Sequence, residues 1–209
     1  MKKRAISPLI AAALLAVMVA APAQSAAGGT TVTVFDPVGD TTKIGAPGTT
    51  PAFLDIIRVE VSKQSQSFEF SMTLAAPVPD QPVLPKQVKE FEWFWPIDTD
   101  PATFPFGFPR APGLAFPPEF LLAVAWDGID YSAFVIDRPP NLERWHARDH
   151  AGRHQCRATV TAVVDVTTLD DPASFGFSGY TRAWFGPRGT EGFAFADVVG
   201  NPGVFHPWP

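Results

Sequence analysis

The sequence predicts an all-β chain that folds as a single-domain antiparallel β-sandwich of the jelly-roll or immunoglobulin-like kind. Three observations predict this class. Short runs of β-branched and aromatic residues recur along the chain with turn residues between them. The 23 prolines and 18 phenylalanines favour short strands separated by proline-rich loops. No stretch of the chain shows a convincing helical periodicity.

The first three strands are expected at residues 31–35, 55–61 and 67–74. The first alternates Thr and Val and is rich in β-branched side chains, which favours a strand. The third places four apolar residues on one face, namely Phe68, Phe70, Met72 and Leu74. A polar turn separates the second run from the third, so these two are expected to pair as a β-hairpin.

The fourth strand, expected at residues 91–97, is the most aromatic part of the chain. Its alternation places four large side chains on one side, namely Phe91, Trp93, Trp95 and Ile97. Such a row can line a core or serve as a platform on which sugar rings stack. Because large rings dominate core burial, we interpret the row as core.

Five further strands are expected, at residues 119–126, 129–136, 157–166, 175–185 and 192–199. The first two of these are joined by Asp127-Gly128, a strong signal for a hairpin turn. Residues 167–172 follow the third and are expected to form a turn or a single helical turn.

The N-terminal residues predict export. A positive start at residues 2–4 precedes an uncharged apolar run at 6–21, and small residues follow it. This order is typical of a secretory signal peptide. We therefore expect residues 1–26 to be removed, residues 27–209 to form the β-sandwich domain, and the mature protein to be secreted, whether extracellular or periplasmic.

Charge and length restrict the classes of partner. After the three basic residues are removed, 13 Lys and Arg remain against 21 Asp and Glu, a formal net charge of −8. Such an acidic chain is not expected to bind nucleic acid or an anionic membrane surface. The mature chain has no further apolar run that predicts a membrane span. About 180 residues are enough for a sizeable core without disulfides, and the oligomeric state is left open.

Five aspartates lie where predicted strands begin or end, and they form the candidate metal site: Asp36, Asp40, Asp55, Asp98 and Asp100. Loops gather at the rims of a sandwich, where carboxylates one or three residues apart can converge on one ion. Ca²⁺ prefers such oxygen ligands, with backbone carbonyls completing its shell. The alternative is that each Asp only caps its own turn by bonding nearby backbone.

Three short acidic motifs carry a family resemblance: Asp36-x-x-Gly39-Asp40, Asp55-Ile56 and Ile97-Asp98-Thr99-Asp100. They resemble motifs of secreted bacterial β-sandwich domains that are similar to DOMON domains and to family 9 carbohydrate-binding modules. Residues 166–177 resemble a turn between two late strands of that group, and Asp197 falls where members often carry an acidic turn. The resemblance implies a jelly-roll-like sandwich, often with structural Ca²⁺, and in some relatives a sugar or haem site.

Trp145 is the candidate ligand-binding residue. It lies in the polar stretch 137–156 and is therefore the tryptophan expected to be most exposed. An exposed ring of this kind would suit a glycan or another cell-surface ligand.

The same polar stretch supports an alternative reading. His146, His150 and His154 recur every four residues, with Cys156 close behind. If residues 142–151 formed a helix, the first two histidines would share a face and could bind a transition metal. A solvated loop is the favoured reading because no recognised zinc spacing is present. A haem site of the DOMON kind would need a Met and a His as axial ligands. Met72 is the one methionine left in the mature chain, and we expect it instead to fill the core.

A carboxylate-dependent hydrolase is a further alternative. No Gly-x-Ser-x-Gly frame is present, and a glycosidase needs two opposed carboxylates that sequence alone does not identify. The leading expectation is an exported, non-catalytic binding or adhesion module that holds Ca²⁺ in its acidic loops.

Overall fold

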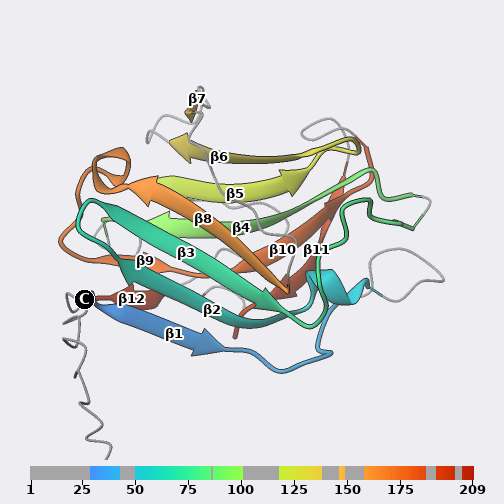
Figure 1. The fold of residues 1–209 in the computed structure, drawn as a ribbon, viewed down its shortest axis with the longest axis horizontal. Coiled ribbons are helices and arrows are strands. Elements are labelled where there is room, and N and C mark those ends of the chain that lie inside the picture. The colour runs from blue at the N-terminus through green and yellow to red at the C-terminus, as the bar shows by residue number, and fades with distance from the viewer. Residues whose placement is uncertain are drawn as a thin grey trace, which may run out of the picture.

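The computed structural model describes residues 29–42, 50–85, 87–100, 118–137, 146–148, 158–186, 192–200 and 204–209, with backbone alone for 146–148. The described chain forms two antiparallel β-sheets that pack against each other (Figure 1). The predicted all-β sandwich is therefore confirmed. Several predictions fall outside the described residues, namely the signal peptide at 1–26, Trp145, His150, His154 and Cys156.

The smaller sheet has four strands in the order β1-β2-β3-β8. Their bounds are β1 Thr31–Phe35, β2 Ile56–Lys63, β3 Ser67–Leu74 and β8 Thr159–Asp165. The hairpin expected between the second and third runs is β2–β3, which pairs from Ile56↔Leu74 to Lys63↔Phe68. β1 and β8 form the two edges of this sheet.

The larger sheet has the order β11-β10-β4-β5-β6-β7, with β9 beside β4 and β12 beside β9. Its strands are β4 Glu90–Asp98, β5 Phe120–Trp126, β6 Tyr131–Asp137, β7 His146–Arg148, β9 Phe175–Phe177, β10 Tyr180–Trp184, β11 Phe193–Val198 and β12 His206–Trp208. The hairpin expected at Asp127-Gly128 is β5–β6, and Gly128 adopts the positive φ of 98° that such a turn requires.

The core between the sheets is built on β4. Phe91, Trp93, Trp95 and Ile97 point into it and are fully buried, as the alternation of their strand predicted. β3 faces them with Phe68, Phe70, Met72 and Leu74, all buried. Within the described chain, Met72 thus fills core.

The single strand expected at 175–185 is two strands, β9 and β10. The interruption lies at Ser178 and Gly179, where the chain passes close to β2 of the smaller sheet. A Cβ at Gly179 would lie 2.5 Å from Cγ2 of Val59 on β2. No side chain fits there, so glycine permits the close approach of the two sheets.

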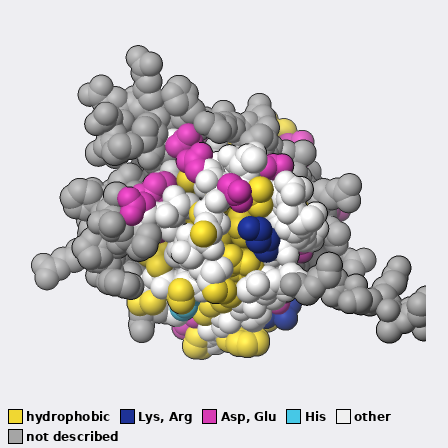
Figure 2. Space-filling model, turned by 90° about the vertical axis from the view of Figure 1, so that its left-hand side faces the viewer, with side chains coloured by type: hydrophobic (Ala, Val, Ile, Leu, Met, Phe, Trp, Pro, Cys, Tyr) yellow, Lys and Arg dark blue, Asp and Glu magenta, His cyan; other side chains and the backbone are white. Residues whose placement is uncertain are grey.

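Two further differences concern strands that the sequence did not indicate. The backbone of His146–Arg148 pairs with Val135–Asp137 of β6, so the helix considered for residues 142–151 is wrong at these three positions. β12 adds a three-residue strand near the C-terminus beside β9. Figure 2 looks at this end of the sandwich, where hydrophobic side chains gather over the lower part and acidic side chains lie above them.

Two single turns of 3-10 helix complete the described structure, η1 at Ala52–Leu54 and η2 at Val166–Leu169. The turn or single helical turn expected at 167–172 is thus a helical turn that begins one residue earlier and ends at Leu169. The Asp165 carboxylate caps it by accepting hydrogen bonds from the Thr167 amide and hydroxyl. No helix among the described residues is long and apolar enough to cross a membrane.

The outer face of the larger sheet is also buried around β4 and β10. Phe94 stacks on Tyr180, with ring centroids 5.2 Å apart. Beside them Arg182 forms an ion pair with Glu92 and lies over three aromatic rings, those of Phe94, Trp184 and Phe193. Pairing and ring contact together satisfy a guanidinium that is almost fully removed from water.

Candidate metal site

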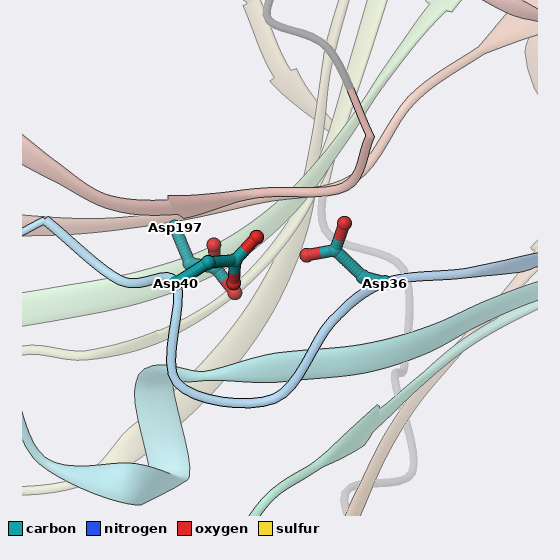
Figure 3. A group of neighbouring side chains, drawn as sticks. All are labelled: Asp36, Asp40 and Asp197. Atoms are coloured by element: carbon teal, nitrogen blue, oxygen red, sulfur yellow. The ribbon is translucent and has the colours of Figure 1, made fainter.

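Three aspartates from distant parts of the chain bring their carboxylates together: Asp36, Asp40 and Asp197 (Figure 3). One oxygen of each lies within 4.8 Å of the others. Asp36 directly follows β1, Asp40 lies in the loop after it, and Asp197 lies on β11. The site therefore joins an edge strand of the smaller sheet to an edge strand of the larger one.

The alternation of β1 sets the direction of the Asp36 side chain. Val32 and Val34 are half-buried on the inner face, and Asp36 continues the same row two residues on. The ladder also continues, because the Asp36 amide donates to the Ile57 carbonyl at 3.1 Å. A carboxylate thus stands where another core side chain would be expected.

The loop after β1 turns back through Gly39, which has a φ of +85°. Its amide donates to Oδ2 of Asp55 at 2.9 Å, which fixes the loop one residue before Asp40. Asp55, at the start of β2, therefore positions the loop that carries Asp40.

A β-bulge in β11 sets the direction of the Asp197 side chain. The register between β10 and β11 shifts between Thr181 and Arg182, which leaves Ala196 as an extra residue on β11. The Ala196 carbonyl accepts a hydrogen bond from the Thr42 amide at 2.8 Å. Oδ2 of Asp197 accepts from the Ile56 amide at 2.6 Å, and its Oδ1 accepts from the Val198 amide at 2.8 Å.

Burial makes these carboxylates unusual. Asp36 and Asp197 are 8% and 4% exposed. Burial is the main cause that raises the pKa of Asp36 to about 6 and that of Asp197 to about 7. Neighbouring acids raise both further, while backbone amides, among them Gly200 for Asp36, oppose the shift.

Two buried oxygens at the site have no hydrogen-bond partner within the part of the chain that the structure describes. They are Oδ2 of Asp36 and Oδ1 of Asp55. Oδ1 of Asp36 is satisfied by the Gly200 amide at 2.7 Å, so the unpartnered oxygen belongs to a side chain that is otherwise well fixed. Buried polar atoms are nearly always satisfied, so each such atom indicates a missing partner such as an ion or water.

The donor set suits a hard cation. All the donors are carboxylate oxygens, which Ca²⁺ prefers, at distances of about 2.4 Å. Two oxygens at that distance from one ion lie at most about 4.8 Å apart, and the three carboxylates meet this limit. The three carboxylates therefore meet the pairwise condition that is necessary for sharing one ion.

The five predicted ligands divide between two places. Asp36 and Asp40 lie together and Asp55 adjoins them, whereas Asp98 and Asp100 lie at the end of β4. The sequence-derived ligand set did not include Asp197, although the family resemblance had drawn attention to an acidic turn there. Alternation along β11 does not reveal it, because the bulge at Ala196 changes which residues share a face.

Asp98 belongs to a second acidic group with Glu119, which the sequence did not single out. Burial, followed by the charge of Glu119 and a hydrogen bond with its side chain, raises the pKa of Asp98 to about 6. The Thr99 amide donates to Glu119 at 3.0 Å, and the Asp100 amide donates to Asp98 at 3.1 Å. Two carboxyl groups that share a hydrogen bond lie closer together than the roughly 5 Å or more between the two carboxyl groups of a glycosidase. The Asp98–Glu119 pair therefore does not have the geometry of that hydrolase class.

No family model matches the chain, and no curated protein or solved structure gives a significant match.

Proposed function

We propose that the protein is an exported, non-catalytic β-sandwich binding or adhesion module whose acidic loop holds a Ca²⁺ ion. Asp36, Asp40 and Asp197 would be its carboxylate ligands, and Asp55 would support the loop. The observation that carries this proposal is the buried carboxylate of Asp36, which lies close to those of Asp40 and Asp197 and whose Oδ2 has no hydrogen-bond partner among the described residues.

Electrostatics favour a cation at this place. Three carboxylates this close repel one another when ionised, and burial increases the free energy of that state. A divalent ion converts the repulsion into attraction and replaces the water that the carboxylates lost. Because the unfolded chain does not hold these residues together, the ion would stabilise the fold by mass action.

The placement of the site favours a structural role for the ion. Its ligands join the edges of two sheets, and backbone amides hold them at Ile56 on β2 and at Gly200 just past β11. Asp40 is the exposed member of the group. An ion there would rigidify the rim of the sandwich, where the loops of a binding module present their ligand contacts.

Calcium binding is tested on the mature chain, residues 27–209. Elemental analysis of the purified protein identifies a resident metal, and calorimetric titration of the chelator-stripped protein measures Ca²⁺ affinity. Asp40→Asn removes one ligand charge at an exposed position and is expected to weaken binding at least tenfold. Asp80→Asn, the same change at another exposed aspartate outside the site, is the matched control. No heat of binding and no resident metal would refute the proposal.

The expected partner is a glycan or another cell-surface ligand. This part rests on the family resemblance and on Trp145. A glycan array probed with the mature protein, with and without Ca²⁺, tests it, and Trp145→Ala is the variant expected to lose any signal. Silence across the array would leave the module without a glycan role.

Export is part of the same proposal, with a secreted, extracellular or periplasmic location. Mass spectrometry of the protein recovered outside the cytoplasm is expected to find a chain that begins near residue 27. Recovery of full-length chain from the cytoplasm alone would contradict it.

A further inference from the structure

We infer that a cation bound at Asp36, Asp40 and Asp197 acts as a latch that holds edge strand β1 in the sandwich. This inference rests on the proposed calcium binding and adds a conformational role to it. The latch would control the opening of one strand, in addition to any effect on the stability of the whole fold.

The two sheet edges meet at this site. β1 is an edge of the smaller sheet and β11 is an edge of the larger one. Two hydrogen bonds join the chain just after β1 to β11 and the chain just after it: Gly200 N to Asp36 Oδ1 at 2.7 Å and Thr42 N to Ala196 O at 2.8 Å. A third joins the start of β2 to β11, from Ile56 N to Asp197 Oδ2 at 2.6 Å. Two of the three end on carboxylates of the acidic group, so the charge state of that group bears directly on the junction.

Contacts other than this junction hold β1 only weakly. It has five residues, and β2 is its one strand partner in the described chain. Its inward side chains, Val32 and Val34, are only half-buried, and Phe35 is 74% exposed. By contrast, all four inward side chains of β3 are buried. Strands with little buried apolar surface open with a low free energy, so β1 is expected to open before β3.

The acidic group makes that opening depend on the cation. Without an ion, the carboxylates repel one another when the edges meet, and Oδ2 of Asp36 and Oδ1 of Asp55 stay buried without partners. Opening of β1 would separate Asp36 from Asp197 and let water reach these oxygens. With an ion bound, the same opening must also release the ion, so its free energy rises with Ca²⁺ concentration.

Hydrogen exchange of the full mature chain tests the latch. Exchange is followed in peptides that cover β1 and β3 over a series of free Ca²⁺ concentrations at fixed pH, with a chelator as the endpoint. Above the dissociation constant, each tenfold rise in Ca²⁺ is expected to slow β1 exchange about tenfold. β1 should exchange faster than β3 throughout, because its opening is local. The two should slow in parallel where β3 exchanges by global unfolding, since both openings release the ion.

Variants identify the groups responsible. Asp40→Asn alters an exposed ligand without removing a buried group, so it should fold, and its β1 exchange should lose most of its dependence on Ca²⁺. Asp80→Asn should retain the full dependence. Terbium luminescence, measured on the same samples, reports binding independently of exchange.

The outcomes separate the latch from calcium binding itself. Terbium binding with β1 exchange that does not respond to Ca²⁺ would overturn the latch and leave the proposed function standing. A single common exchange rate for β1 and β3 at every Ca²⁺ concentration would also overturn the latch and leave the proposed function standing. The ion would then act only on the stability of the whole fold. Absence of terbium and Ca²⁺ binding would overturn both proposals.

Discussion

The buried carboxylates predict an unusual dependence of stability on pH. The chelated protein should become less stable as pH rises from 4 to 8. Asp36 and Asp197 have folded-state pKa values raised from 3.8 to about 6 and about 7. A group with a raised folded-state pKa contributes stability below its unfolded pKa and loses that contribution as pH rises through the folded value. The loss is therefore expected between about pH 4 and pH 7.

The size of the loss follows from the same values. Each pH unit of difference between the folded and unfolded pKa corresponds to about 1.4 kcal/mol. Asp36 alone would then contribute about 3 kcal/mol, and Asp197 about 4 kcal/mol. The two effects are not additive, because the charge of Asp36 is one of the causes that raise the pKa of Asp197. A combined loss of about 4 kcal/mol would lower the melting temperature of a domain this size by roughly 10 °C.

The assay is thermal unfolding of the mature protein at pH values from 4 to 8, with either chelator or excess Ca²⁺. Without Ca²⁺ the melting temperature should fall across this range. With Ca²⁺ the ion neutralises the ionised carboxylates, so the fall should disappear above pH 6. Asp197→Asn, which keeps an oxygen that can accept from Ile56, should remove the Asp197 part of this fall and leave the part due to Asp36 between about pH 4 and pH 6. A chelated melting temperature that is constant or rises with pH would refute the electrostatic reasoning.

Three substitutions test other parts of the fold by urea unfolding. Gly179→Ala should destabilise by about 1–3 kcal/mol, because its Cβ would meet Val59 at 2.5 Å; no effect would mean that the sheets can separate at little cost. Arg182→Ala should lower stability by about 3–5 kcal/mol because it leaves Glu92 charged and buried, and Arg182→Lys should recover only part of it. Asp165→Ala should cost about 1 kcal/mol through loss of the η2 cap, whereas Asp165→Asn should be nearly neutral.

Alternation was enough to predict the strands that have one buried face. The strand expected at 67–74 has those bounds in the structure, because four apolar residues alternate there with polar ones. The break at Gly179 was not predictable in the same way, since it depends on how closely Val59 approaches from the other sheet. The burial of Glu92 was also not evident, because its ion-pair partner, Arg182, lies 90 residues further along the chain.

The candidate site likewise has one part that local sequence predicts and one part that depends on distant residues. Asp36 and Asp40 are close in sequence, so their turn could be recognised from residue spacing. Their distance from Asp98 and their closeness to Asp197 depend on which strands form the sheet edges, and local sequence does not specify this. Strand ends that look equivalent in sequence can lie at different places along the rim of a sandwich.

The bond between Gly200 and Asp36 joins residues 164 positions apart, close to the two ends of the described chain. Contacts of such high sequence separation form late, since the entropy of closing so long a loop is recovered only when the intervening strands are already in place. A ligand that depends on this contact cannot guide early folding. It would act on the reverse reaction, slowing unfolding while leaving the folding rate nearly unchanged. The junction of the two edges would therefore determine how long the folded molecule persists.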